Sequence, residues 1–176
     1  MSKVFGHILT AILVVLAAST TYLLWTIASW RVGVQIVAVL IIGALGEHHI
    51  SGQGYYHYTK SKTNGFFVGR VPLWIPFMWV FIVQGTLVFS LMIGLPAAGA
   101  ILGSGLIGAV LDLLVIEPLL SRERALWTWT PVENGYLGFI PSQVDRFTAP
   151  PGNYLVWLVF PVVANWLLYG LMILFP

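Results

Sequence analysis

The fold class is decided by the run HILTAILVVLAASTTYLLWTIASW, residues 7–30, which contains no Asp, Glu, Lys or Arg. This run is longer than the roughly 20 residues that carry an α-helix across a bilayer. The chain of 176 residues is 59% hydrophobic and only 8% charged, whereas about 25% of a soluble domain is charged. We therefore expect an integral membrane protein with a single transmembrane domain covering residues 1–176.

Four further apolar runs follow, so we predict an all-α bundle of about five transmembrane helices. The predicted spans are residues 8–30, 32–50, 72–95, 97–116 and 154–175. The first span also has features of a signal peptide, because the basic Lys3 precedes it and it contains the small residues Ala17, Ala18 and Ser19. The apolar run continues past these small residues to Trp25, which favours a retained helix.

Prolines mark several of the predicted helix ends. Pro72 and Pro76 suit the start of the third helix. Pro96 marks a tight link to the fourth helix, which we expect to end before Pro118. The aromatic, proline-rich connection from 117 to 153 is long, and long connections without regular structure usually act as lids or binding loops.

Basic residues are distributed unequally between the two sides of the predicted bundle. The N-terminus and the loops after the second and fourth helices carry Lys3, Lys60, Lys62, Arg70, Arg122, Arg124 and Arg146. The other side carries only Arg31. The positive-inside rule therefore predicts a multi-pass protein of the cell membrane with its N-terminus and both long loops in the cytoplasm.

Composition excludes several kinds of site. The chain has no cysteine, which removes disulfides, thiolate nucleophiles and cysteine-ligated metals. Its net charge of +2 is too small to indicate a nucleic-acid surface. The neighbouring His48 and His49 would point about 100° apart on a helix and would not chelate one ion. We therefore expect no metal and no cofactor.

Polar side chains collect where the second helix ends, between Gly46 and Thr59. We expect one of the histidines there to form a hydrogen bond with Glu47. Aromatic residues elsewhere in the chain suit the same site, although tyrosines and tryptophans also anchor helices at the membrane interface. The candidate substrate-binding residues are His48, His49, Tyr56, His57, Tyr58, Trp79, Trp127, Trp129 and Tyr136.

Glu47, Asp112 and Glu117 are the candidate catalytic acids. An acid inside the membrane costs about 2.5–3.5 kcal/mol on insertion scales and is usually functional. Glu47 and Asp112 are expected at similar depth, facing one cavity between the second, third and fourth helices. Asp112 and Glu117 would point about 140° apart on an α-helix, but Pro118 disfavours a helix at Glu117, so its side chain can turn back toward that cavity.

Other polar and small residues in the predicted helices have structural explanations. Asp112 could instead pair with an arginine such as Arg122 and only hold helices together. The pairs Gly99/Gly103 and Ser104/Gly108 permit close helix contact. Asn165 could satisfy a carbonyl group that Pro161 leaves free.

The remaining chemistry is that of carboxylic acids among aromatic rings. Burial raises the pKa of a carboxyl group, so one acid could stay protonated and protonate an alkene. Tyrosine and tryptophan faces would stabilise the resulting cation. Capture by water gives hydration, and capture by an internal double bond gives cyclisation. The substrate would be a membrane lipid or isoprenoid dissolved in the bilayer.

Several short motifs occur in a familiar order. They are Gly43-x-x-x-Glu47, Gly54-Tyr55-Tyr56-His57-Tyr58, Val71-Pro72 with Trp79, Asp112 with Glu117-Pro118, Trp127-Thr128-Trp129 and Tyr136-Leu137-Gly138. In this order the chain resembles the membrane carotenoid-biosynthesis proteins that include carotenoid 1,2-hydratases and bisanhydrobacterioruberin hydratase. The resemblance implies a cofactor-free enzyme acting on an isoprenoid. In that family the second acid is usually an Asp and lies one residue closer to the first than Glu117 lies to Asp112.

Two alternatives to a hydratase remain open. A membrane terpene cyclase would use the same acids and exclude water. A small subunit or assembly factor of a membrane complex would suit the short length, the few charges and the glycine-rich helix faces, and would need a partner protein. A homo-oligomer is compatible with each of these functions.

Overall fold

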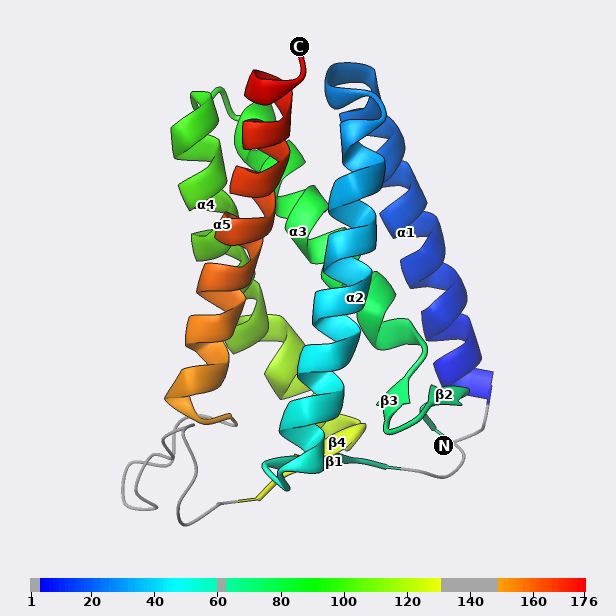
Figure 1. The fold of residues 1–176 in the computed structure, drawn as a ribbon. Helices are drawn as coiled ribbons and strands as arrows, with labels where there is room; N and C mark the ends of the chain where they lie inside the picture. Colours follow the sequence, from blue (N-terminus) through cyan, green and yellow to red (C-terminus); the bar gives the residue numbers. More distant parts are fainter. Residues whose placement is uncertain (1–3, 60–62, 131–148) are drawn as a thin grey trace.

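The computed structural model describes residues 4–59, 63–130 and 149–176. Long helices form a bundle (Figure 1): α1 Val4–Ala28, α2 Arg31–Gly52, α3 Trp74–Met92, α4 Ala97–Leu111 with its continuation η1 Asp112–Glu123, and α5 Pro151–Leu174. Within the described residues, five helical segments are long and apolar enough to cross a membrane, with α4 and η1 forming one of them. The predicted all-α class with five spanning helices is confirmed at this level.

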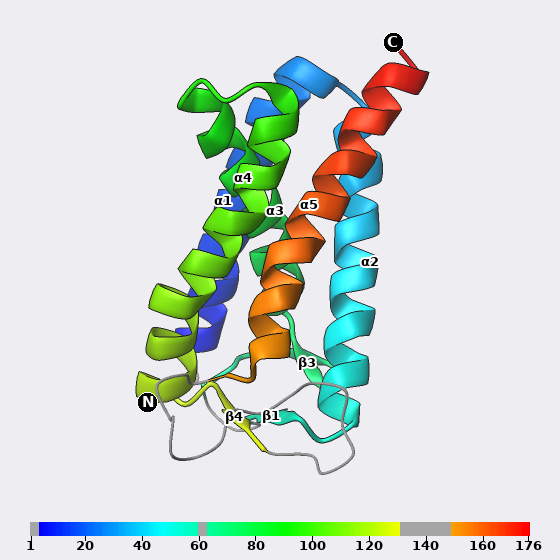
Figure 2. The same ribbon diagram turned by 90° about the vertical axis from the view of Figure 1, so that its left-hand side faces the viewer.

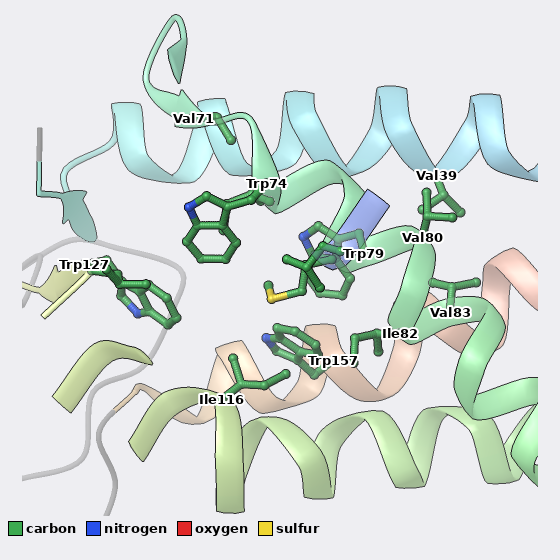
Figure 3. Close-up of a cluster of buried hydrophobic side chains, with 14 of the residues drawn as sticks. Val39, Val71, Trp74, Trp79, Val80, Ile82, Val83, Ile116, Trp127 and Trp157 are labelled. Carbon is green, nitrogen blue, oxygen red and sulfur yellow. The ribbon is translucent and has the colours of Figure 1, made fainter. Parts of the chain in front are cut away.

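The helix α3 lies at the centre of the bundle and contacts each of the other four long helices. Because α3 has neighbours on several sides, a larger share of its residues is buried than in any other described span. Around its first turns, Trp74 and Trp79 pack with Trp157 of α5 in the larger hydrophobic core (Figure 3). The helix ends at Met92, where Gly94 adopts a positive φ of 85° that favours glycine.

Short strands gather at one end of the bundle, near the start of α1, while the C-terminus lies at the other end (Figures 1 and 2). Strand β1 Tyr56–Tyr58 pairs antiparallel with β4 Trp127–Trp129. Strand β2 Phe67–Val68 pairs antiparallel with β3 Val71–Pro72. These strands are not predicted from the sequence, and the β1–β4 pair joins two connections that lie far apart in the chain.

Several predicted helix boundaries differ from the structure, and two of them involve prolines. The third helix begins at Trp74 rather than Pro72, because Pro72 belongs to β3. The fourth helix passes through Pro118 and ends at Glu123, because residues 112–123 form a π-helix. A proline in an α-helix clashes with the carbonyl four residues earlier, whereas π-helical hydrogen bonds connect residues five apart.

A network of hydrogen bonds joins all five spans inside the bundle, and we call it the amide network. Gln84 Nε2 donates to Gln35 Oε1 at 3.3 Å, and Gln35 Nε2 donates to Asn165 Oδ1 at 2.8 Å. Asn165 Nδ2 donates to the Val83 carbonyl and to Ser104 Oγ, so the prediction that Asn165 serves the carbonyl freed by Pro161 is wrong. The network consists of Thr20, Thr21, Gln35, Gln84, Ser104 and Asn165.

Small residues of α4 allow α5 to lie close to it, as the sequence predicts in part. A Cβ atom at Gly105 would lie 2.2 Å from the Leu158 carbonyl oxygen, and one at Gly108 would lie 3.0 Å from the Trp157 carbonyl oxygen. Gly99 faces only its own preceding loop at Leu95 and Pro96. The close packing of α4 on α5 brings the first turn of α5 beside η1, which begins at Asp112.

Candidate active site

Glu47 lies in the last two turns of α2 and accepts hydrogen bonds from three aromatic side chains. Trp79 Nε1 of α3 donates to its Oε1 atom at 2.9 Å. Tyr58 Oη donates to its Oε2 atom at 2.7 Å, and Tyr56 Oη donates to the same oxygen. The histidine that the sequence led us to expect is not among these described donors, and a phenol or an indole occupies each position instead.

Strand pairing explains why these aromatic side chains converge. In β1, Tyr56 and Tyr58 point to one face and His57 to the other, because side chains alternate along a strand. The register places Tyr56 opposite Trp129 and Tyr58 opposite Trp127. The paired rings lie 4.8 Å and 6.2 Å apart between centroids. His57 is exposed on the opposite face of the strand.

Glu117 lies in η1 and is only 2% exposed. Trp127 Nε1 donates to its Oε1 atom at 3.2 Å. Trp129 Nε1 lies between both carboxyl oxygens, 3.2 Å from Oε1 and 3.1 Å from Oε2. The tryptophans of β4 therefore hold Glu117 as the tyrosines of β1 hold Glu47, and the paired strands fix the two carboxyl groups relative to each other.

Asp112 is fully buried at the start of η1. Its Oδ2 atom accepts a hydrogen bond from Asn153 Nδ2 of α5 at 2.6 Å, whereas its Oδ1 atom is buried with no hydrogen-bond partner among the described residues. Arg122 is exposed and is not one of the described donors to Asp112. The alternative that Asp112 forms a helix-holding pair with Arg122 is therefore wrong.

The π-helix changes the relation between Asp112 and Glu117. In the α-helix assumed from sequence they would point about 140° apart. A π-helix connects each residue to the one five positions later, so such residues lie on the same side of neighbouring turns. Both acids are buried toward the bundle. The π-helix therefore lets Asp112 and Glu117 lie on the same buried side of η1.

Glu47 and Glu117 border two adjoining cavities, and we call these cavities, together with Glu47, Glu117 and the nearby Asp112, the carboxyl site. The outer cavity has a volume of about 270 Å³ and is lined by Ile42, Gly43, Gly46, Glu47, Ile50, Tyr56, Trp79, Trp129, Asn153, Val156 and Phe160. The inner cavity has a volume of about 30 Å³ and is lined by Glu47, Tyr56, Tyr58, Ile75, Met78, Glu117, Trp127, Trp129, Asn153 and Trp157. Glu47, Tyr56, Trp129 and Asn153 belong to both walls.

The cavities differ in position from the single cavity that we expected from the sequence. The outer cavity lies between α2, α3 and α5 and beneath the paired strands, rather than between the second, third and fourth helices. The inner cavity borders α2, α3 and η1, as expected, and also α5. Asp112 lines neither of them and reaches their wall only through Asn153. Glu117, rather than Asp112, therefore shares a cavity with Glu47.

The outer cavity lies at the surface of the bundle between α2 and α5. Its lining residues Ile42, Gly46 and Val156 are exposed on the apolar outer face of these helices. At the inner side, Gly43 lets Trp79 pack against α2, because a Cβ atom there would lie 3.2 Å from Trp79 Cδ1. The outer cavity therefore opens on the apolar outer face of the bundle between α2 and α5, with Glu47 in its wall.

The phenols of β1 are poor acids in this environment. Burial, followed by the nearby Glu47 carboxyl group, raises the pKa of Tyr56 well above its usual value. The same two causes raise the pKa of Tyr58. Both phenols therefore remain hydrogen-bond donors to Glu47 throughout the physiological pH range.

The structure brings together part of the predicted set of substrate-binding residues. Tyr56, Tyr58, Trp79, Trp127 and Trp129 surround the cavities. His48 and His49 are exposed, because helical rotation turns them away from the side on which Glu47 points inward. Tyr136 lies outside the described residues.

Asn153 was missed by the sequence analysis, because an asparagine in the first turn of a helix usually indicates only a turn or a cap. Its importance depends on contact with Asp112, which lies 41 positions away in the chain. Within the described ranges no three His, Asp or Glu side chains are grouped closely enough to hold a metal ion. The expectation of a metal-free protein remains a prediction.

Comparisons of this chain with protein-family models, with curated proteins and with solved structures gave no match. The resemblance to carotenoid-biosynthesis proteins therefore continues to depend on the short motifs themselves.

Proposed function

We propose that this protein is a membrane-embedded enzyme that protonates an alkene of an isoprenoid chain and adds water to the resulting cation. The observation that carries the proposal is the placement of Glu47 at the boundary between an apolar cavity, open toward the bilayer, and a second carboxyl group. The described hydrogen-bond donors to the three acids are neutral tyrosine, tryptophan, serine and asparagine side chains. Carboxyl groups without cationic partners suit proton transfer better than structural ion pairing.

The positions of the acids suggest separate roles. Glu47 is the acid that lines the outer cavity and would deliver its proton to the alkene. Glu117 lines the inner cavity and would accept a proton from water. Asp112 would be a positioning residue that acts through Asn153. General acid–base catalysis of this kind contributes about 10²- to 10⁴-fold to the rate.

Aromatic faces would stabilise the cation formed in the outer cavity. Tyr56, Trp79 and Trp129 all contribute to its wall. Each ring over which a desolvated cation passes contributes roughly 0.5–2 kcal/mol. The ring of Trp79 is supported from behind by Trp157, with 4.3 Å between their centroids, so its position is fixed before the substrate arrives.

The size of the outer cavity favours the end of a long substrate. Its volume of about 270 Å³ lies below the roughly 300–1,000 Å³ of pockets that enclose a drug-sized ligand. The amide network hydrogen-bonds all five spans to one another, so a long chain that ran along the bundle axis would have to break those bonds. One end of the chain would therefore enter between α2 and α5, while the remainder stays in the bilayer.

The orientation in the membrane is part of the proposal. Among the described basic residues, Arg70, Arg122 and Arg124 belong to the end of the bundle that carries the strands, and Arg31 belongs to the other end. The positive-inside rule then places the carboxyl site at the cytoplasmic face of the cell membrane. Reporter fusions after Asn64 and after Glu133 should both report the cytoplasm, and an external signal from either would reverse the orientation.

Expression in a lycopene-producing bacterium tests the activity. A pigment heavier by one water molecule indicates hydration, and a product of unchanged mass with altered absorption indicates a cyclase. Unchanged pigments, together with a protein that is stable only in complex with a partner, would indicate a subunit or assembly factor and overturn the proposal.

A further inference from the structure

The inner cavity is distinguished from the outer one by its polar lining. Its volume of about 30 Å³ is too small for an isoprene unit but exceeds the roughly 10–15 Å³ that accommodates one water molecule. Glu47 and Glu117 contribute carboxyl groups to its wall, and Tyr58 and Asn153 contribute a hydroxyl and an amide. The outer cavity, by contrast, is mostly bounded by aliphatic and aromatic side chains.

We propose that the inner cavity is a binding site for a single water molecule held between Glu47 and Glu117. A buried water typically forms about three hydrogen bonds. The two carboxyl groups offer acceptors, and Asn153 offers an amide at the wall shared with the outer cavity. Water binding depends only on this geometry, whereas its catalytic use rests on the proposed function.

The paired strands and η1 give this site its fixed size. The rings of Trp127 and Trp129 cover it from β4, and the same indoles hold Glu117 through hydrogen bonds of 3.1–3.2 Å. Ile75 and Met78 of α3, which are 2% and 5% exposed, form apolar parts of its wall. Well-packed surroundings leave little room for the cavity to expand, so it selects a ligand of the size of water.

A water molecule at this site would complete the hydration reaction. The Glu47 carboxylic acid gives its proton to one alkene carbon and becomes a carboxylate, and the other alkene carbon becomes a cation. A lone pair of the water oxygen forms the C–O bond, and the Glu117 carboxylate takes the proton that leaves that oxygen. The product is a tertiary or secondary alcohol, and return of the proton from Glu117 to Glu47 restores the site.

This arrangement explains why hydration, rather than cyclisation, is the proposed reaction. The inner cavity adjoins the outer one at Glu47, Tyr56, Trp129 and Asn153. Water placed there lies on the protein side of a cation in the outer cavity. The proposed reaction would thus supply a hydroxylated isoprenoid end to an enzyme class that modifies alcohols or the adjacent carbons.

Two indole groups provide a matched test that requires no substrate. Trp127 and Trp74 are 6% and 0% exposed, and their Nε1 atoms donate to Glu117 at 3.2 Å and to Asn64 at 3.3 Å. Trp127 lines the inner cavity, whereas Trp74 is absent from the lining of both cavities of the carboxyl site. NMR of ¹⁵N-tryptophan-labelled protein in detergent or nanodiscs can detect cross-relaxation between water and each indole proton, distinguished from proton exchange by its sign in the rotating frame.

We expect cross-relaxation with water at the Trp127 indole proton and none at that of Trp74. An Ile75→Phe variant, which fills the inner cavity, should remove the Trp127 signal. An Ile42→Phe variant, which changes only the outer cavity, should preserve it. Absence of the signal at Trp127 in the unmodified protein would overturn the water site even if Ile75→Phe does not fold.

The result separates this inference from the proposed function. A water signal at Trp127 in a protein that leaves isoprenoids unchanged would support the water site and reject the hydratase. Hydrated product without a water signal would support the hydratase and reject the water site.

Discussion

Two groups of polar side chains lie within the spanning helices, and they differ in whether their hydrogen bonds are complete. In the amide network, the nitrogen and oxygen atoms of Gln35, Gln84 and Asn165 all have protein partners. In the carboxyl site, one buried oxygen of Asp112 has no partner among the described residues. Glu47 and Glu117 border the cavities of the carboxyl site. Thr20 and Asn165 of the amide network also line cavities, but their polar side-chain atoms are hydrogen-bonded within the protein.

The difference shows how structural and functional polarity can be distinguished inside a membrane protein. A closed network of neutral amides satisfies its own groups and stabilises helix association. Acids that face a cavity have bonding capacity directed at a ligand, and intramembrane acids are costly enough that they usually have a function. We therefore expect changes in the amide network to alter stability and changes in the carboxyl site to alter turnover.

The largest expected effect is on turnover in the carboxyl site. Glu47→Gln and Glu117→Gln should each lower pigment conversion per folded molecule by about 10²- to 10⁴-fold, because an amide cannot exchange the required proton. Glu123→Gln is the matched control, since Glu123 is exposed at the end of the same helix η1. Conversion is measured by pigment analysis normalised to folded protein from size-exclusion chromatography. Wild-type conversion in both site variants would reject their catalytic roles.

A smaller effect is expected in the amide network. Asn165→Leu removes the amide that bonds the Val83 carbonyl and Ser104, and leaves the Gln35 amide without its partner Oδ1 atom. Hydrogen bonds between membrane helices contribute about 1–2 kcal/mol, so the free energy of unfolding should fall by about that amount. Reversible unfolding in mixed detergent measures the change. If Asn165→Leu kept wild-type stability but lost conversion, the assignment of the amide network to stability rather than turnover would be wrong.

The smallest effect concerns pH. Because the pKa values of Tyr56 and Tyr58 are raised in the folded protein, their contribution to stability is complete below about pH 10, the pKa of an unperturbed tyrosine. Above that pH the unfolded chain loses these protons first, so the free energy of unfolding falls as the pH rises. A spectrophotometric titration of phenolate tests this. Near pH 10, the folded double variant Tyr56→Phe/Tyr58→Phe should show the same phenolate absorbance as the folded wild type. When both are unfolded in denaturant, the variant should show two fewer titrating tyrosines.

Much of the fold could be predicted from the sequence. The apolar runs are long and nearly free of charge, so the spans follow from length and hydropathy alone. Glu47 and its aromatic neighbours Tyr56 and Tyr58 could be found because they are close in the chain. Trp79, Trp127 and Trp129 were also named, although their contacts with the acids could not be derived from their spacing.

The remaining features depend on contacts between distant segments. The π-helix at Asp112 has no signal in α-helical periodicity, and Pro118 pointed to a helix end instead. Pairing of β1 with β4 joins segments separated by about 70 positions, and its alternation decides that His57 faces away from the site. Gln35 and Gln84 are isolated polar residues in apolar runs, and their partners are known only once the helices are packed.

The most direct test of acid-catalysed hydration is isotope incorporation by the purified protein in nanodiscs that contain lycopene as the acyclic probe. The reaction is run in D₂O, and separately in H₂¹⁸O, and the product is analysed by mass spectrometry. If the carboxyl site protonates the alkene and water captures the cation, each hydration in D₂O adds one carbon-bound deuterium. Each hydration in H₂¹⁸O places one ¹⁸O atom in the new hydroxyl group. A hydroxylated product that contains neither isotope would contradict it, as would a deuterated product that has gained no oxygen.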